Sequence, residues 1–223
     1  MKLGEFELNK IYCMDCLEGL KKIPDKSIDI CITDPPYGIN MQNGLGLSKS
    51  FGSSPKTVRF YEDDSNWDSK TPDKEVFDEI LRVSKKVFIF GGNYFTDKLP
   101  LGTCWIVWDK QGDIKFDNPF SACELIWTNL DKKAIKKYIV IQQGFVKDKE
   151  PNNDRVHPTQ KPVKLIRDIL KDNEGNVVLD CFIGSGTTAV ACKQLGRNFI
   201  GFEISQEYCD IANKRLQQEV LTI

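Results

Sequence analysis

Short apolar runs alternate along this chain with segments of helical periodicity, and this alternation limits the fold more than any other feature. SIDICIT, KVFIFGG, NVVLD and RNFIGFEI have the length and residue types of buried strands. The pattern predicts an α/β fold in which helices cover both faces of a mostly parallel central sheet. TCWIVWDK and SACELIWTN have no helix between them, and they are expected to form an antiparallel hairpin at one edge.

Helices are predicted between these strands. In TPDKEVFDEILRVS, we expect Thr71 as the N-cap and Pro72 as the first helical residue, where the missing N–H of proline costs nothing. Further helices are expected in CLEGLKKIP, KPVKLIRDILKD, CFIGSGTTAVACKQLG and SQEYCDIANKRLQQEV. Residues 39–60 are rich in Gly, Ser and Asn without periodicity and are predicted to be a long loop.

The 223 residues fit one domain, 1–223, with ordinary apolar content for a soluble protein. The apolar runs are strand-sized, so no membrane span is expected, and MKLGEFELNK has no apolar signal core, which predicts a cytoplasmic location.

Most cysteines stand singly in apolar runs, as buried thiols of a reducing compartment do (Cys31, Cys104, Cys123, Cys181, Cys192). The Cys13-x-x-Cys16 pair lacks further ligands nearby, so no metal is expected.

A glycine turn joins a predicted buried strand to a predicted helix in VVLDCFIGSGTTAVA. Gly184, Gly186 and Ala189 match the G-x-G-x-x-G/A fingerprint, and Glu203 ends the next strand where an acid can bind ribose hydroxyls. The turn indicates a cofactor that contains adenosine; the alternative is a purely structural turn. Asp180 argues against NAD, because a carboxylate suits a cationic group better than a pyrophosphate.

Three motifs together make this chain resemble a known enzyme family. DPPYG, HPTQKP and DCFIGSGTT with GFEIS resemble S-adenosylmethionine-dependent DNA methyltransferases that act on exocyclic amino groups, in the β-class motif order. FGGNYF, WIVWDK and ACELIW stand where that family has its lesser motifs. The resemblance implies a Rossmann-like class I methyltransferase fold with a circularly permuted motif order. NVVLD and NFIGFEI should then lie against KIYCMD and SIDICIT in the sheet.

The resemblance also implies which residues bind S-adenosylmethionine. Glu203 would hold the ribose hydroxyls, Asp15 the adenine amino group, and Lys161 is a candidate partner for the cofactor carboxylate. His157 is the only histidine, and it has the alternative of being a loop residue before a helix. The whole implied set is Asp15, Cys16, Asp34, His157, Thr159, Lys161, Asp180, Phe182, Gly184, Ser185, Gly186, Thr187 and Glu203.

The catalytic residues implied are Asp34, Pro35, Pro36 and Tyr37. An exocyclic amine is a poor nucleophile because its lone pair is delocalised into the ring. Asp34 and the Pro35 carbonyl could accept its two hydrogens while Tyr37 stacks on a base flipped out of the duplex. In the family that the chain resembles, DPPY is more typical of adenine-N6 enzymes and SPPY of cytosine-N4 enzymes, so the resemblance implies adenine N6 as the target. The alternatives are cytosine N4, RNA or a protein glutamine as substrate, or a regulator without catalysis. Methylation of cytosine at C5 fits poorly. It needs a cysteine nucleophile, which enzymes of that kind carry after a proline, and no proline precedes a cysteine here.

DNA contacts are expected in two basic stretches of a chain whose net charge is −1. By resemblance, target recognition falls in a short insert at about 130–156. Phosphate contacts are predicted for Lys49, Lys56, Arg59, Lys132, Lys133, Lys136 and Lys137; the alternative is a solvated lysine face. A second copy of the chain and a cognate restriction endonuclease are candidate partners, and a bacterial, archaeal or phage source is expected.

Overall fold

The computed structural model describes residues 2–39, 68–114, 121–131, 134–143, 146–147 and 160–217. From residue 40 on, the long loop predicted at 39–60 lies outside these ranges. Within the described part of the chain, no helix is long and apolar enough to cross a membrane.

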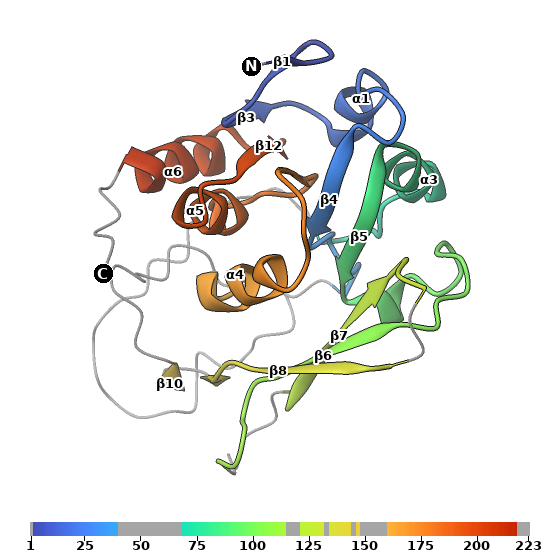
Figure 1. The fold of residues 1–223 in the computed structure, drawn as a ribbon, viewed down its shortest axis with the longest axis vertical. Coiled ribbons are helices and arrows are strands. Elements are labelled where there is room, and N and C mark those ends of the chain that lie inside the picture. Colours follow the sequence, from blue (N-terminus) through green and yellow to red (C-terminus); the bar gives the residue numbers. More distant parts are fainter. Residues whose placement is uncertain are drawn as a thin grey trace.

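The central sheet has eight strands in the order β3-β12-β11-β4-β5-β7-β6-β8 (Figure 1). Their bounds are β3 (Lys10–Cys13), β12 (Asn198–Glu203), β11 (Val177–Asp180), β4 (Ile28–Thr33), β5 (Ser84–Phe90), β7 (Cys123–Thr128), β6 (Trp105–Asp109) and β8 (Lys136–Ile139). Neighbours from β3 to β5 are parallel, which confirms the mostly parallel sheet. Small separate pairs join β1 (Lys2–Leu3) to β2 (Phe6–Glu7), and β9 (Gln142–Gln143) to β10 (Val146–Lys147).

The tryptophan-rich strands form the expected antiparallel hairpin, since β7 runs antiparallel to β6 and also to β5. Its predicted position at the edge of the sheet is wrong. The edge strand is β8, which pairs in parallel with β6 from Ile106↔Lys136 to Asp109↔Ile139. Part of the predicted 130–156 insert therefore belongs to the central sheet.

Strands from the two ends of the chain are interleaved in the sheet. The late strand β11 pairs with the early strand β4, and β12 pairs with β3. β11 and β12 lie side by side between these two early strands. This confirms the adjacency that the permuted motif order predicts, and it brings the carboxyl ends of all four strands to one edge.

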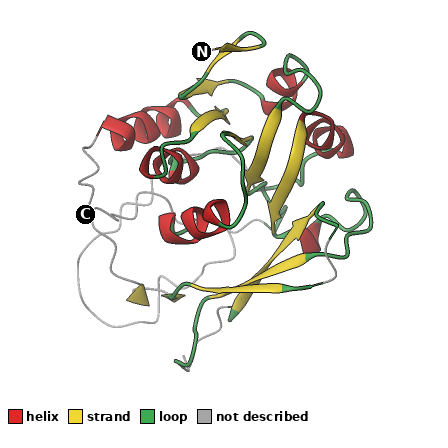
Figure 2. Ribbon diagram, in the orientation of Figure 1, coloured by secondary structure: helices red, strands yellow, loops and turns green. Residues whose placement is uncertain are grey.

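Helices cover both faces of the sheet (Figure 2). Their bounds are α1 (Cys16–Leu20), α3 (Lys74–Val83), α4 (Val163–Lys171), α5 (Thr187–Gln194), α6 (Gln206–Gln217) and the 3-10 turn η2 (Gly92–Tyr94). Buried residues of α4 and α5 pack with Ile30 and Ile32 of β4, whereas those of α1 and α3 pack with Cys31 from the opposite face. Because β4 is buried on both faces, its sequence is a continuous apolar run.

The prediction for the start of α3 is wrong. Its N-cap is Asp73, which has extended backbone angles, so Pro72 stands before the cap rather than inside the helix. The Thr71 hydroxyl and the Pro72 carbonyl both bind the Lys98 ammonium. This contact with a distant lysine holds Thr71 outside the helix.

All eight cysteines are free thiols. Four of the five that were expected to be buried are buried, but Cys123 is exposed at the first position of β7. In the C-x-x-C pair, Cys16 is buried in α1, whereas Cys13 is exposed at the end of β3. The pair therefore divides between the core and the surface.

The buried carboxylate of Asp180 ties β11 to β4 and α5. Its Oδ1 accepts hydrogen bonds from the Thr33 hydroxyl (2.8 Å) and the Phe182 backbone N–H (3.1 Å). Its Oδ2 accepts a bond from the Thr188 hydroxyl at 2.6 Å. Burial raises the pKa of Asp180 to about 6, although these donors act in the opposite direction. The glycine turn is thus fixed to the neighbouring strand through a carboxylate that is costly to ionise.

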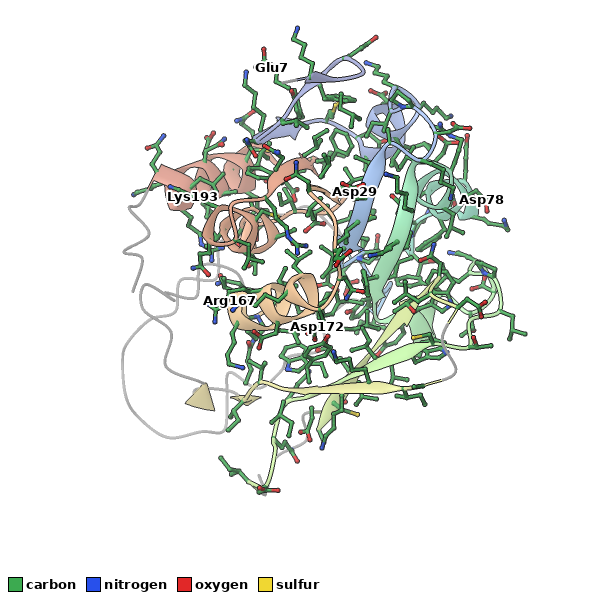
Figure 3. The ribbon with its side chains drawn as sticks, in the orientation of Figure 1. Glu7, Asp29, Asp78, Arg167, Asp172 and Lys193 are labelled. Atoms are coloured by element: carbon green, nitrogen blue, oxygen red, sulfur yellow. The ribbon has the colours of Figure 1, made fainter. Side chains whose placement is uncertain are left out.

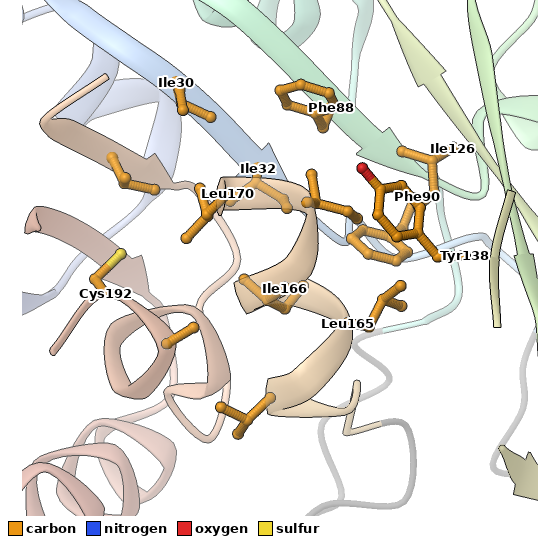
Figure 4. Close-up of a cluster of buried hydrophobic side chains, with 14 of the residues drawn as sticks. Ile30, Ile32, Phe88, Phe90, Ile126, Tyr138, Leu165, Ile166, Leu170 and Cys192 are labelled. Atoms are coloured by element: carbon orange, nitrogen blue, oxygen red, sulfur yellow. The ribbon is translucent and has the colours of Figure 1, made fainter. Parts of the chain in front are cut away.

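Truncation of a core residue should test the packing between α4 and the sheet, which Figure 4 shows around Ile30, Ile32 and Leu165. Ile30 is fully buried, so Ile30→Ala should lower the free energy of unfolding by about 2–5 kcal/mol. Ile135→Ala is the matched control, because Ile135 is 67% exposed and its truncation should cost less than about 0.5 kcal/mol. Urea unfolding measures both, and equal midpoint shifts would contradict the packing described.

The pKa of Asp180 predicts a dependence of stability on pH. In the unfolded chain the pKa of an aspartate is about 3.9. Between pH 4 and 6 the folded state therefore binds a proton at Asp180 more tightly than the unfolded state does. The contribution of Asp180 to stability therefore falls as pH rises through this window and is level above it. Asp180→Asn removes this contribution. The wild type should lose about 3 kcal/mol relative to the variant between pH 4 and 7, as measured by urea unfolding; a constant difference would contradict the shift.

Candidate active site

The predicted site residues that the structure describes gather at the carboxyl edge of the parallel strands. Asp34 and Tyr37 follow β4, Asp15 follows β3, and Glu203 ends β12. The glycine turn follows β11, which lies between β12 and β4. Ligands of open α/β sheets bind at this edge, because loops from neighbouring strands converge there.

The two glycines of the turn have different structural roles. Both have positive φ, +50° at Gly184 and +84° at Gly186, where side chains are disfavoured. A Cβ at Gly186 would lie 2.8 Å from the Ala212 Cβ, so this glycine lets α6 pack against the N-terminus of α5. A Cβ at Gly184 would meet no atom within 4 Å. Gly184 thus leaves open space where a ligand could approach the backbone.

Glu203 supports the glycine turn from the next strand. Its Oε2 accepts a hydrogen bond from the Gly184 N–H, and its Oε1 accepts one from the Ser205 N–H, both at 2.9 Å. Burial raises the pKa of Glu203, and the backbone donors partly offset this. The carboxylate is therefore fixed in position beside the open space at Gly184.

A pocket at this edge brings together four of the predicted cofactor residues. It is lined by Met14, Asp15, Cys16, Cys181, Phe182, Glu203 and Ile204. Asp15 is the N-cap of α1, and its Oδ1 accepts bonds from the N–H groups of Leu17 (2.8 Å) and Glu18 (3.2 Å). The pocket therefore combines two carboxylates, from the residues after β3 and at the end of β12, with a mainly apolar lining.

Ser185 and Thr187 are buried on the other side of the turn. The Arg215 guanidinium of α6 donates to the Ser185 carbonyl at 2.6 Å and to its hydroxyl at 3.1 Å. The Ser185 hydroxyl also lies 3.5 Å from Gln160 Oε1. Ser185 therefore holds the turn against α6 and the segment before α4.

The DPPY segment meets a lysine from the distant HPTQKP motif. Tyr37 donates its hydroxyl to Asp34 Oδ1 at 2.6 Å, and the Lys161 ammonium lies 2.5 Å from Asp34 Oδ2. The Tyr37 ring stacks on Tyr94 of η2 with ring centres 4.7 Å apart. Lys161, expected to bind a cofactor carboxylate, is thus paired with Asp34, the predicted catalytic aspartate, in this structure.

A second carboxylate shares this lysine. Glu124 of β7 places Oε2 at 3.6 Å from the Lys161 ammonium, and its Oε1 lies 2.5 Å from the Lys110 ammonium. Burial acts to lower the pKa of Lys161, but Asp34 and Glu124 outweigh it and the net shift is upward. For Asp34, burial outweighs Lys161 and raises the pKa. The result is a buried ammonium between two carboxylates.

Sequence reasoning missed Glu124, Lys110 and Tyr94 as members of the site. Glu124 could have been noticed, because it is the one charged residue in the apolar run ACELIW. Tyr94 lies in FGGNYF, where an aromatic residue follows a glycine stop. Lys110 had no signal, since a lysine after a strand is usually a solvated residue.

Several predicted residues lie outside the described part of the chain: Lys49, Lys56, Arg59, Lys132, Lys133, His157 and Thr159. Lys136 and Lys137 are described on β8. Lys136 pairs with Asp172, which lies between the end of α4 and β8 in Figure 3, and Lys137 lies 3.2 Å from Asp109 Oδ2. Both lysines are about half exposed and already have acidic partners, so their binding to phosphate stays a prediction.

Comparison with known proteins gives the family. The chain is 28% identical to the Type II methyltransferase M1.MboII of Moraxella bovis, over 95% of this chain and 98% of that protein. It is 31% identical to the Type II methyltransferase M.HinfI of Haemophilus influenzae, over 95% of this chain and 69% of that protein. The M1.HpyAVI–SAM complex shares the fold, with a TM-score of 0.60 and 22% identity over 94% of this chain and 99% of that one. Residues 100–214 match the N6/N4 methyltransferase model described as DNA methylase, and the chain belongs to this family of DNA methylases.

Proposed function

We propose that this chain transfers a methyl group from S-adenosylmethionine to the N6 amino group of an adenine flipped out of DNA. The observation that carries the proposal is that the DPPY carboxylate and the pocket with Glu203 and Asp15 lie at one edge of one sheet. The DPPY form of the motif supports adenine. Cytosine N4 is the second candidate, because the family model covers both kinds of amine.

The pocket suits the adenosine part of S-adenosylmethionine. Glu203 is a fixed carboxylate of the kind that binds ribose hydroxyls, and Asp15 can accept a hydrogen bond from an adenine amino group. The open space at Gly184 lets the ligand reach the backbone. When bound, S-adenosylmethionine supplies an electrophilic methyl group. Lys161 is assigned to Asp34 rather than to the cofactor carboxylate, because it lies 2.5 Å from Asp34 Oδ2.

Asp34 and the Pro35 carbonyl would accept the two hydrogens of the target amine and free its lone pair. Pro35 and Pro36 have locked φ angles and no N–H, so the carbonyl between them is held in place. Tyr37 is braced by its bond to Asp34 and by its stack on Tyr94, and its ring offers a surface for the flipped base. These residues supply position and hydrogen-bond acceptors, and direct displacement needs little more.

DNA recognition is proposed for the predicted insert at about 130–156, with help from residues 39–60. A homodimer and a cognate restriction endonuclease remain proposed partners. Sedimentation of the full chain at assay concentration tests the dimer, and a monomer alone would overturn it.

The base assignment is tested on DNA methylated by the purified chain. Digestion and mass spectrometry should find N6-methyladenine, and sequencing that detects methylation should place it in one short recognition sequence. Asp34→Ala should lower the transfer rate by about 100-fold or more, since it removes an acceptor at the reacting amine. Asp78→Ala, at an exposed ion pair on α3, is the matched control and should retain activity.

Two outcomes would contradict the proposal. N4-methylcytosine without N6-methyladenine would make the base assignment wrong while leaving the methylase family in place. Methylated RNA without methylated DNA would overturn the substrate itself.

The proposed phosphate binding is tested by salt dependence. Alanine at Lys132, Lys133, Lys136 and Lys137 should weaken DNA binding and flatten the slope of log affinity against log salt by about 0.9 for each phosphate that is no longer neutralised. Alanine at four ion-paired lysines outside the insert, Lys10, Lys21, Lys74 and Lys85, makes the same charge change as a control. Equal slopes in the two variants would contradict a specific lysine face.

A further inference from the structure

One oxygen of Glu124 has no hydrogen-bond donor among the described residues. Oε1 is held by the Lys110 ammonium at 2.5 Å, but the buried Oε2 accepts no hydrogen bond. The Lys161 ammonium forms a long ion pair with this oxygen at 3.6 Å, beyond the length of a hydrogen bond. The same ammonium lies only 2.5 Å from Asp34 Oδ2.

A buried carboxylate oxygen without a donor is unfavourable and calls for an explanation. Glu124 is held in this position by Lys110, which itself lies over the Trp108 ring. The oxygen that accepts no hydrogen bond therefore lies on the Lys161 side of a fixed carboxylate. A second functional state in which this oxygen accepts a hydrogen bond would account for it.

We propose that Glu124 Oε2 is a second binding position for the Lys161 ammonium, which shifts to it from Asp34 when the target amine donates a hydrogen bond to Asp34. The inference rests on the proposed function and assigns Glu124 as a positioning residue that acts through Lys161. The shift is small, because closing 3.6 Å to about 2.8 Å needs a movement of about 1 Å.

The surroundings of Lys161 favour such a shift. Its backbone is fixed, since Pro162 is the N-cap of α4 and the Gln160 carbonyl accepts a bond from the Gln142 side chain. The ammonium lies 5.3 Å from the centre of the Phe90 ring and 5.7 Å from that of Tyr37. In this buried site the ammonium needs a carboxylate partner at each position, and Glu124 supplies the second.

The shift would solve a conflict at Asp34. In the structure Tyr37 occupies one oxygen of Asp34 and Lys161 the other, so a target amine meets a carboxylate that already has two donors. Moving Lys161 to Glu124 frees Oδ2 for the amine and keeps the ammonium beside a carboxylate, while Asp34 retains the hydrogen bond from the Tyr37 hydroxyl. Without the Glu124 charge, freeing Asp34 would strand an ammonium in a buried site.

The first test compares Glu124→Gln with a matched control, Glu79→Gln. Their side chains are similarly exposed, 22% and 19%, and Glu79 pairs with Arg82 on α3, away from the site. Glu124→Gln should lower the single-turnover rate of methyl transfer by about 30-fold or more, within the range for removal of a positioned electrostatic group. Affinity for DNA and for S-adenosylmethionine should change by less than about threefold, and the control should keep the wild-type rate.

The pH profile separates positioning from a packing defect. Of the described residues, Tyr37 and Lys161 contact Asp34, and the charges of Glu124 and Asp180 also act at this site. Lys110 is paired with Oε1 of Glu124. Because Glu124 is a like charge, its removal favours ionised Asp34 and should move the acid limb of the rate to lower pH. A packing defect would lower the rate equally at every pH, and that result would overturn the inference.

A direct readout does not depend on the rate. A crystal structure of the wild-type chain with S-adenosylhomocysteine and a duplex that contains its recognition sequence should place the Lys161 ammonium within about 3 Å of Glu124 Oε2. Lys161 still paired with Asp34 beside a bound base would overturn the inference alone. A wild-type chain that methylates no base in DNA would instead overturn the proposed function, and the inference with it.

Discussion

The parallel pairing of β11 with β4 is the contact on which the rest of the site depends. It sets Val178 opposite Ile30 and Leu179 opposite Cys31, and so joins two segments nearly 150 residues apart. The Thr33–Asp180 hydrogen bond continues this contact to the last residue of each strand. DPPY and the glycine turn then leave the sheet side by side. Any change that shifted this register would move DPPY, which is proposed to bind the target amine, away from the glycine turn, which is proposed to bind the methyl donor.

The same edge of the sheet concentrates buried charge. Burial raises the pKa of Asp180, Asp34 and Glu203, and each is supported by a different set of donors. Asp180 and Glu203 bind hydroxyls and backbone N–H groups, and they organise the turn. Asp34 is the exception, because its partners are a phenol and an ammonium that other groups can replace. This difference fits the proposed role of Asp34, in which its carboxylate accepts hydrogen bonds from the target amine.

Much of the fold was predictable from local pattern, because strands buried on both faces and amphipathic helices mark the sequence directly. The failures have tertiary causes. Thr71 has the chemistry of an N-cap, but Lys98 binds its hydroxyl. The tryptophan-rich hairpin was predicted at the edge of the sheet, but β8, which comes from a lysine-rich segment, pairs with β6 and forms the edge. Cys123 is in an apolar run, but it stands at the exposed end of its strand.

The sequence by itself determined the local pieces of the site: the rigid DPPY segment, the Gly184–Gly186 turn and the acids at strand ends. These pieces could be identified because they depend on residue types at fixed spacing, which are properties of the sequence and do not require the tertiary structure. Only the tertiary structure decided that Lys161 lies between Asp34 and Glu124. These three residues come from distant parts of the chain, and only sheet order, helix packing and the balance between burial and charge bring them within reach of one another.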